Sequence, residues 1–383
     1  MKPAGCAHVA AEHGKRLVIK IGSSTLTTSE SKIDYAYLAA VTDQIARARA
    51  AGWSPVVVTS AAIACGLEQL GIEKRPHDMP SLQAAASVGQ SALSTAYAEA
   101  FARHDIVTST VLLTRRDTAD RRAYLHARDT FDRLLELGVV PIVNENDTIS
   151  VEQIRFGDND TLAALVACLI EADLMVILSD IDGLYDANPN THADARLISR
   201  VEAIGPDIMA AAGEAGSTVG SGGMITKIKA ARVLMVAGIP LVVCDGHRPE
   251  AIVDAAAGKD VGTLFVAAKK PHEITPKKLW IALGDAARGA LVVDDGAKAA
   301  LIGRGSSLLS VGVCGVEGRF EAGDIIDIED GTGHLFARGK VAATCDEVQL
   351  AVGKSREALR ANRLLAHLAD KPLVHRDELV VFE

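Results

Sequence analysis

The chain has 383 residues, more than one small hydrophobic core accommodates, and this length predicts two domains, or three. Hydrophobic residues make up 49% of the sequence and charged residues 23%, a composition typical of folded globular proteins and not of disordered ones. The net charge of −9 gives no general basic surface for nucleic acid, and an anionic membrane would repel it.

The N-terminal segment and the cysteines bear on where the protein works. Residues 1–16 contain no apolar run of signal-peptide length, and no stretch of about 18 apolar residues occurs elsewhere. The cysteines form no CxxC pair and are typical of buried thiols in a reducing compartment, rather than of disulfides or zinc ligands. They are Cys6, Cys65, Cys168, Cys244, Cys314 and Cys345. We expect a cytoplasmic protein.

Short apolar runs alternate with alanine-rich amphipathic stretches through the first two thirds of the chain. The predicted strands are 16–22, 54–60, 139–147, 173–180 and 239–246, and the main predicted helices are 35–51, 82–103, 120–137 and 160–171. Strands that alternate with helices predict βαβ units, and therefore an α/β fold with a mainly parallel sheet sandwiched by helices. In such a sheet, ligands bind beyond the carboxyl ends of the strands.

The pattern changes near residue 270. The segment 269–278 is polar and contains two prolines, so it is predicted to be a linker. Short β-like runs with turn signals follow it, and a helical piece is expected near 354–369. We therefore expect one domain over residues 1–270 and a small β-rich domain over residues 276–383.

Lys20 lies inside an otherwise apolar predicted strand and is followed by Gly22, Ser23 and Ser24. A buried ammonium without a partner is costly, so this lysine either reaches solvent at the strand end or meets an anion. The small residues after it favour an anion, because their backbone N–H groups can approach phosphate oxygens.

Ser60 stands at the end of another predicted strand, in the segment VTSAAIACG at 58–66. It is either the N-cap of a helix or, through its hydroxyl and the adjacent amides, a ligand for a substrate carboxylate. No GxSxG sequence surrounds it, so it is not predicted to be a nucleophile.

Two acidic clusters follow, NENDTIS at 144–150 and GDNDTLAAL at 157–165. Either cluster could be a solvated loop, and Asp160 could be no more than a helix start. As functional groups, one carboxylate would bind a substrate ammonium and another would position a pair of lysines.

Two further segments have the composition of nucleotide-binding loops. The segment SDIDGLYDANP at 179–189 suits either a base and ribose or a plain strand-to-turn connection. The segment GSGGMITKIKAA at 220–231 lacks the Walker pattern and precedes a helix predicted to begin near Thr226. Lys227 would then lie in the first helical turn, where the helix dipole disfavours a cation unless an anion binds there. A solvent-facing lysine is the alternative.

Together and in this order, these motifs resemble the amino acid kinase superfamily, and within it the glutamate 5-kinase family, over essentially the whole chain. From residue 279 onward, VDDGAKAALIGRGSSLL and EAGDIIDI resemble the PUA domain that many of these kinases carry. The resemblance implies the amino acid kinase fold followed by a PUA-like barrel. It also implies phosphoryl transfer from ATP, which carries Mg²⁺, to the γ-carboxylate of L-glutamate. The product, γ-glutamyl phosphate, begins proline biosynthesis.

The resemblance also implies the roles of individual residues. Lys20 and Lys227 match the lysines that flank the transferring phosphoryl group, and Asp160 matches the carboxylate that holds both. The substrate-binding positions match Ser60, Asp147 and Asn159, with Asp158 beside them. The ATP-binding positions match Lys20, Gly22, Ser23, Ser179, Asp180, Ser221, Gly222, Gly223, Met224, Ile225, Thr226 and Lys227. No protein residue is implied as a metal ligand.

The sequence departs from the family pattern at two positions. Ala61 stands where the family usually has glycine, and its Cβ is expected to crowd the substrate carboxylate. Ser221 replaces the more usual threonine at the start of the glycine loop, which is a mild change.

Two alternative functions are weighed against this one. The first is another kinase of the superfamily, acting on aspartate, N-acetylglutamate, carbamate or a nucleoside monophosphate. The second is an RNA-binding accessory protein, because PUA domains are best known in that setting. Residues 276–383 contain 14 Lys and Arg against 16 Asp and Glu, a net charge of −2, whereas RNA-binding domains normally carry a basic patch. RNA is therefore not an expected partner.

The resemblance implies further partners that no residue specifies. Proline is the expected feedback inhibitor, acting at or near the glutamate pocket. A homo-oligomer, either a dimer or a tetramer, is expected. Because γ-glutamyl phosphate is labile, a γ-glutamyl phosphate reductase is a plausible partner for its handover.

Overall fold

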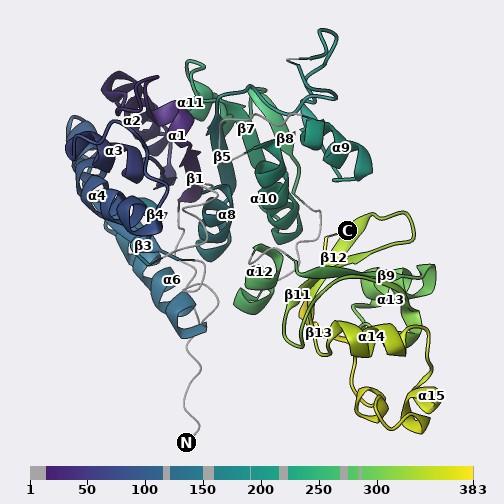
Figure 1. Cartoon of the computed structure of the whole chain (residues 1–383). Coiled ribbons are helices and arrows are strands. Elements are labelled where there is room, and N and C mark those ends of the chain that lie inside the picture. The colour runs from purple at the N-terminus through teal and green to yellow at the C-terminus, as the bar shows by residue number, and fades with distance from the viewer. Residues whose placement is uncertain are drawn as a thin grey trace, which may run out of the picture.

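The computed structural model of the chain describes residues 14–114, 121–149, 159–189, 191–214, 223–267, 275–283 and 287–382. They form a larger α/β unit and a smaller β-rich unit, which lies at the lower right of Figure 1. The larger unit is built on an eight-stranded sheet in the order β3-β4-β2-β1-β5-β7-β8-β6. Its strands are β1 (Lys15–Ile21), β2 (Trp53–Val58), β3 (Thr108–Leu113), β4 (Val140–Glu145), β5 (Leu174–Ser179), β6 (Arg200–Val201), β7 (Leu241–Asp245) and β8 (Gly262–Phe265).

All neighbouring strands of this sheet pair in parallel, except β7 with β8. The predicted, mainly parallel sheet is confirmed, and so are the five predicted strands. Strand β1 lies between β2 and β5, and the chain order reverses beside it. In an open parallel sheet, such a switch point opens a crevice at the carboxyl ends of the strands. The polar segments that follow β1, β2, β4 and β5 therefore share one edge of the sheet.

Helices cover both faces of the sheet (Figure 1). One face carries α1 (Ser23–Leu26), α2 (Tyr35–Ala50), α3 (Ala62–Gln69), α4 (Met79–Ala102) and α11 (Ala251–Ala256). The other carries α6 (Arg121–Glu136), α8 (Asp160–Leu169), α9 (Pro206–Glu214), α10 (Met224–Ala237) and α12 (Pro276–Leu283). Among the described residues, no helix has both the length and the apolar character needed to cross a membrane.

The side chains of β1 alternate between these two layers, as a pleated strand requires. Leu17 and Ile19 belong to the core under α2 and α4. Val18 belongs to the core under α8 and α10. Because the period is two residues, Lys20 lies on the same face as Val18 and meets α8 and α10.

Helices α3 and α4 approach each other so closely that only glycine fits where they cross. A Cβ built on Gly66 would lie 1.7 Å from the Ala85 carbonyl oxygen, and one built on Gly89 would lie 1.8 Å from that of Ala62. Neither clash involves a flexible side chain, so an added methyl group would force the helices apart. This contact fixes α4 against the start of α3, which follows directly on the Ser60 segment.

The smaller unit contains a five-stranded sheet in the order β10-β9-β11-β12-β13, with β9 and β11 parallel and the other pairs antiparallel. Its strands are β9 (Gly289–Val293), β10 (Val313–Gly318), β11 (Ile325–Glu329), β12 (Leu335–Val341) and β13 (Val374–Val381). Its helices are α13 (Asp295–Arg304), η1 (Ser310–Gly312), α14 (Cys345–Ala351), α15 (Arg356–Ala361) and η2 (Ala366–Leu368). This unit has its own hydrophobic core, centred on Phe336, Leu291 and Ile326.

Helix α12 connects the two units. The predicted linker 269–278 is wrong at its end, because α12 already begins at Pro276, a residue suited to the first turn of a helix. Residues 268–274 lie outside the described residues. Leu279 and Ile281 of α12 are buried in the same core as Val380 of β13. The smaller unit also contacts α10, where the Arg232 guanidinium lies 5.4 Å from the centre of the Phe382 ring.

The five cysteines in the described part of the chain are free thiols. Cys65 and Cys244 are buried, as expected, and Cys168 and Cys345 are partly buried. The expectation of buried thiols is wrong for Cys314, which is exposed on β10. Cys6 lies outside the described residues.

We expect Gly89→Ala to lower the free energy of unfolding by about 3 kcal/mol, because the new methyl group must displace backbone atoms of α3. Gly303→Ala is the matched control. Gly303 lies in α13 with nothing within 4 Å of a Cβ built on it, so alanine should stabilise the helix by about 0.5–1 kcal/mol. Urea denaturation of both variants measures the difference. Equal stability of the two would contradict the close packing of α3 on α4.

Candidate active site

Two lysines converge on one buried carboxylate at the carboxyl edge of the sheet. Lys20 Nζ lies 2.7 Å from Asp160 Oδ1, and Lys227 Nζ lies 3.3 Å from Asp160 Oδ2. Both lysines are 5% exposed and Asp160 is 0% exposed. The alternatives of a snorkelling Lys20 and a solvent-facing Lys227 are therefore wrong.

Three elements bring these groups together. Lys20 is the last residue but one of β1, within its buried part, and Asp160 is the first residue of α8. Helix α10 begins at Met224, two residues before the predicted start, and it holds Lys227 in its first turn. The Thr226 hydroxyl lies 2.9 Å from Asp160 Oδ2 and adds a further polar contact to the carboxylate.

The electrostatics of Asp160 follow from this arrangement. Burial by itself would raise the pKa of its carboxyl group. The Lys20 and Lys227 ammonium groups, with the Thr226 hydroxyl, outweigh burial and hold the pKa of Asp160 well below its usual range. The carboxylate is therefore ionised at neutral pH, and it fixes both ammonium groups in place.

Two glycines lie next to the lysines. Gly22 directly precedes α1, and a Cβ built on it would lie 3.5 Å from Lys20 Nζ. Gly223 directly precedes α10 and has open space where a Cβ would be. Ammonium groups and unpaired backbone N–H groups at a helix start together suit an anion such as phosphate. Ser23, the first residue of α1, is exposed.

The remaining predicted nucleotide-binding residues lie along the same edge of the sheet. Ser179 ends β5, is buried, and donates a hydrogen bond of 3.1 Å to the exposed carboxylate of Asp180. The Gly246 N–H after β7 donates to the Ser179 carbonyl oxygen at 2.8 Å. Met224 is buried and Ile225 is 39% exposed. Ser221 and Gly222 lie outside the described residues.

The predicted substrate residues Ser60 and Asn159 lie in contact. Asn159 Nδ2 donates to Ser60 Oγ at 3.2 Å and to the Thr59 carbonyl oxygen. Asn159 precedes α8, yet its side chain makes no capping hydrogen bond. Ser60 is not a helix N-cap either, because that position of α3 is held by Ala61. Both side chains are therefore available for a role other than capping.

Asp147 follows β4 and stands apart from the lysine pair. Burial raises the pKa of its carboxyl group to about 6, and the nearby Arg75 lowers it only partly. The Asp147 carboxylate is thus ready to accept a cation that compensates for its loss of water. Asp158 lies outside the described residues.

Sequence reasoning missed Gln90 and gave no separate role to Asn144, although Asn144 begins the acidic cluster at 144–150. Asn144, at the end of β4, is 2% exposed and accepts a hydrogen bond from Asn159 Nδ2. Gln90 of α4 accepts one from Asn144 Nδ2. The only signal for Gln90 is a long polar side chain after Gly89 in the alanine-rich segment AAASVGQSAL.

Ala61 has a backbone conformation that L-residues rarely adopt. Its φ is 77° and its ψ is 8°, in the left-handed region, and the residue is 8% exposed. A Cβ in this region costs roughly 1–2 kcal/mol, which glycine avoids. The unusual alanine therefore strains the segment that carries Ser60.

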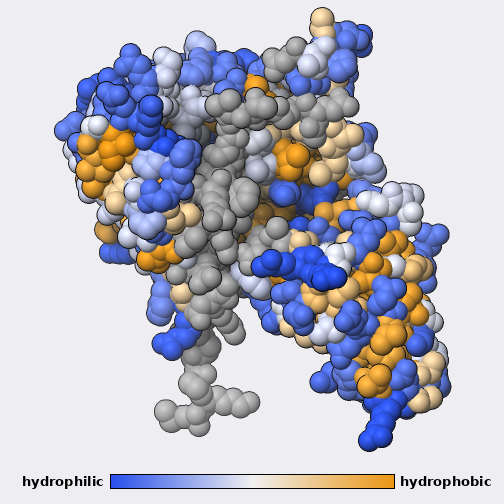
Figure 2. All heavy atoms as spheres, in the orientation of Figure 1, coloured by the Kyte–Doolittle hydropathy of each residue, from blue (hydrophilic) through white to orange (hydrophobic). Residues whose placement is uncertain are grey.

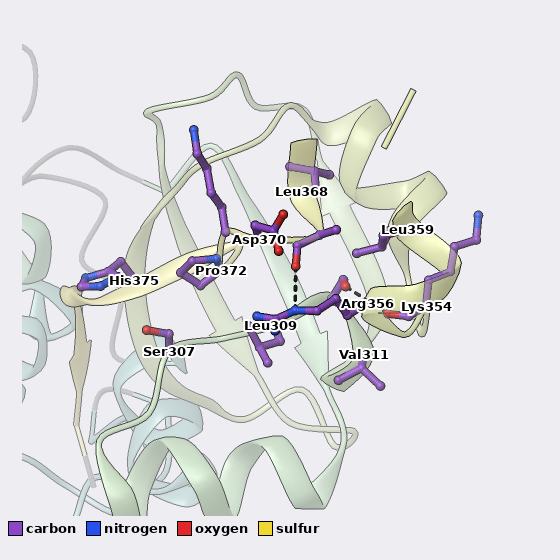
Figure 3. A pocket seen from close by; sticks show the side chains of 13 residues that line it. Ser307, Leu309, Val311, Lys354, Arg356, Leu359, Leu368, Asp370, Pro372 and His375 are labelled. Atoms are coloured by element: carbon purple, nitrogen blue, oxygen red, sulfur yellow. Dashed lines mark hydrogen bonds between the residues drawn. The ribbon is translucent and has the colours of Figure 1, made fainter. Parts of the chain in front are cut away.

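A separate pocket of about 320 Å³ lies in the smaller unit, far along the chain from the lysine pair (Figure 3). Its walls include Leu309, Val311 and Arg356, whose Nε donates to the Ala369 carbonyl oxygen at 3.0 Å. Figure 2 shows hydrophobic patches among hydrophilic residues on the visible face of this unit, and Leu309 and Val311 are 50% and 54% exposed.

Comparison with known proteins identifies the family of the chain. The sequence matches the amino acid kinase family over residues 15–245, which is more than half of the chain. The chain belongs to the amino acid kinase family. It also matches the PUA domain over residues 289–361, within the smaller unit. Because the amino acid kinase match covers more than half of the chain, the rival interpretation as an RNA-binding accessory protein is not favoured.

Curated relatives match the chain over nearly its full length. The glutamate 5-kinase of Geobacter sulfurreducens is 44% identical over 367 residues, covering 96% of this chain and 97% of the relative. That of Streptomyces coelicolor is 44% identical over 378 residues, covering 98% of each chain. That of Caldanaerobacter subterraneus is 40% identical over 368 residues, covering 96% of this chain and 98% of the relative.

We expect Ala61→Gly to raise the free energy of unfolding by about 0.5–1 kcal/mol, because relief of the left-handed strain exceeds the entropy that glycine adds to the unfolded chain. Ala64→Gly, in the same short helix, is the control and should destabilise by about 1 kcal/mol. Thermal unfolding of the two variants tests the sign. If Ala61→Gly destabilises as much as the control does, the strain at Ala61 is not real.

Proposed function

We propose that this protein is a glutamate 5-kinase, which transfers the γ-phosphoryl group of ATP to the γ-carboxylate of L-glutamate. The products are γ-glutamyl phosphate and ADP, and the reaction is the first step of proline biosynthesis. The observation that carries the proposal is the convergence of Lys20 and Lys227 on the buried Asp160 carboxylate. The near full-length similarity to glutamate 5-kinases supports the choice of substrate.

The chemistry of this reaction suits a site without a general base. The γ-carboxyl group of glutamate, with an ordinary pKa of about 4.3, is already an anionic nucleophile at neutral pH. Catalysis then requires in-line placement of the two substrates and cations beside the charge that develops on the phosphoryl oxygens. Lys20 and Lys227 supply those cations from two different elements of the fold, and Asp160 fixes their positions.

The acidic pocket is the proposed glutamate site. The Asp147 carboxylate accepts the α-ammonium, the Ser60 hydroxyl and the amide after it meet a carboxylate, and Asn159 contributes its side-chain amide. Asp158 is proposed to line the same pocket. A bound ammonium would restore the solvation that the partly buried Asp147 carboxylate has lost, which favours binding of a zwitterionic amino acid.

The ATP site is proposed to lie across the switch point, between the ends of β1, β5 and α10. Lys20 and Lys227 contact the phosphates, while Ser179 and Asp180 lie near the base and ribose. The other proposed members of the ATP site are Gly22, Ser23, Ser221, Gly222, Gly223, Met224, Ile225 and Thr226. Mg²⁺ is proposed to arrive on the phosphate oxygens, as hard divalent cations do with nucleotides.

Several expectations go with this function and stay predictions. They are a cytoplasmic location, a homo-oligomer (dimer or tetramer), feedback inhibition by proline and handover of product to a γ-glutamyl phosphate reductase. We also propose a catalytic domain over residues 1–270 and a PUA-like domain over 276–383. The alternative substrates, aspartate and N-acetylglutamate, are tested directly below.

An ATP-dependent hydroxamate assay tests the substrate. We expect product with L-glutamate and at least about 100-fold less kcat/KM with aspartate or N-acetylglutamate, because a pocket built for polar groups rejects a substrate that leaves them unpaired. Equal rates with aspartate would contradict the assignment. Adding proline to the same assay shows whether feedback inhibition occurs.

We expect Lys227→Ala to lower kcat by about 100-fold or more, because a cation on the developing phosphoryl charge is lost. Lys229→Ala, which removes an exposed lysine two residues further along the same helix, is the matched control and should keep kcat within about twofold. Steady-state kinetics of both variants decide the point. Normal turnover by Lys227→Ala would eliminate the proposed role of this lysine.

The raised pKa of Asp147 predicts a specific pH dependence. Only the ionised carboxylate binds an ammonium, so kcat/KM for glutamate should fall below pH about 6 and approach a tenfold loss per pH unit. The bound ammonium favours the ionised form, so kcat should hold to lower pH than kcat/KM does. In Asp147→Asn the titration near pH 6 should vanish. A variant that keeps it would assign this titration to another group.

A further inference from the structure

We propose that Gln90 of α4 is a positioning residue for the substrate pocket, because it fixes the side-chain amide of Asn144, which in turn fixes that of Asn159. The inference rests on the proposed function, because it assumes that a substrate ammonium binds beside Asp147. It adds that the side-chain amide of Asn159 supports that ammonium. Gln90 itself lies behind the pocket, and it acts through a chain of two hydrogen bonds.

The first step is that the backbone of α4 is held rigidly beside Gln90. Gly89 is the point of closest approach to α3, where a Cβ would lie 1.8 Å from the Ala62 carbonyl oxygen and 2.3 Å from the Gly66 nitrogen. A helix packed at this distance can neither slide nor rotate without a clash. The Cα of Gln90, one residue later, is therefore fixed relative to the segment that carries Ser60.

The second step is that Gln90 presents an acceptor, and not a donor, to Asn144. Gln90 Nε2 donates to Ser94 Oγ at 3.2 Å, one helical turn further along α4. Its Oε1 faces β4 and accepts from Asn144 Nδ2 at 2.9 Å, the hydrogen bond that selects this orientation of the Gln90 amide. Ser94 Oγ also accepts from the Thr110 hydroxyl of β3 at 3.0 Å, which anchors the outer end of the chain.

The third step is the orientation of Asn144. With Nδ2 bound to Gln90, its Oδ1 accepts from two donors, Asn159 Nδ2 and the Glu145 N–H, each at 2.9 Å. If the amide were turned over, Nδ2 would face both of these donors, and a buried donor against a donor is costly. Gln90 removes that alternative, because only the observed orientation gives its Oε1 a partner.

The fourth step carries the orientation to the pocket. Asn159 Nδ2 faces three acceptors, namely Asn144 Oδ1, the Thr59 carbonyl oxygen and Ser60 Oγ. Its Oδ1 must then lie on the other side of the amide group, available to accept. An ammonium has donors only, so an Asn159 that presents an acceptor supports the Asp147 carboxylate in binding the α-ammonium of the substrate.

Kinetics of three variants test this relay, by which we mean the chain of hydrogen bonds from Gln90 through Asn144 to Asn159. Gln90→Met keeps the length of the side chain and loses its hydrogen bonds, and we expect KM for glutamate to rise about tenfold, which corresponds to about 1.4 kcal/mol. KM for ATP should stay within about twofold, because the lysine pair is not part of the chain of hydrogen bonds. Gln90→Glu keeps an acceptor for Asn144 Nδ2 and should hold KM for glutamate within about threefold.

Ser94→Ala is the matched control on the same helix. It removes the outer anchor and leaves the Gln90–Asn144 hydrogen bond, so it should change KM for glutamate by less than about threefold. The relay is overturned if Gln90→Met leaves KM for glutamate unchanged, if Gln90→Glu is as impaired as Gln90→Met, or if KM for both substrates rises equally.

The proposed function and the relay fail in different ways. Wild-type protein without glutamate-dependent product overturns the function, and the relay is then decided by a crystal structure of Gln90→Met. The relay requires that this structure lose the 2.9 Å contact between Asn144 Oδ1 and Asn159 Nδ2 or show the Asn144 amide turned over. An unchanged pair of side chains would overturn the relay by itself.

Discussion

The Asp160 carboxylate, held between two buried lysines, is the constraint on which the rest of the site depends. Burying three charged groups is costly unless each meets an opposite charge at short range. Lys20 contacts the Asp160 carboxylate because β1 directs every second side chain toward α8. Lys227 contacts the same carboxylate because the first turn of α10 lies beside the first turn of α8. Displacement of any one of these elements would leave a buried charge without compensation, so the elements must keep their positions.

The closely packed helices α3 and α4 support the proposed glutamate site from the opposite face of the sheet. The glycine contact between α3 and α4 fixes Ser60 on one side and Gln90 on the other. Hydrogen bonds then extend from α4 through Asn144 to Asn159, the residue directly before Asp160. The hydrogen-bonded chain and the lysine pair therefore meet at adjacent residues, 159 and 160, which would tie the proposed substrate site to the position of the lysines.

The sequence is informative about this fold where the signal is local. Apolar runs indicate the buried parallel strands. An isolated lysine in such a run, Lys20, leaves open whether it reaches solvent or meets an anion, and only the small residues that follow it favour an anion. The family resemblance supplies the pairing of Lys20 and Lys227 with Asp160, which spacing alone leaves open. The start of α10 is misplaced by two residues because Met224 and Ile225 carry no capping signal.

The sequence does not indicate which side chains form hydrogen bonds with each other when they are far apart along the chain. Gln90 and Asn144 are 54 residues apart, and neither segment contains a signal that predicts their hydrogen bond. The end of the linker is mistaken because Pro276 is read as a breaker, although proline suits the first turn of a helix. The left-handed backbone of Ala61 is invisible for a related reason, since alanine ordinarily indicates regular helix.

In the proposed mechanism, Lys20 and Lys227 hold the same phosphoryl group from two sides. A crystal structure of the protein with a non-hydrolysable ATP analogue, Mg²⁺ and glutamate tests it most directly. We expect both Nζ atoms to lie within about 3.2 Å of γ-phosphoryl oxygens while the Asp160 carboxylate still contacts both lysines. A γ-phosphoryl group bound by only one of the two lysines, or placed elsewhere on the sheet edge, would contradict it.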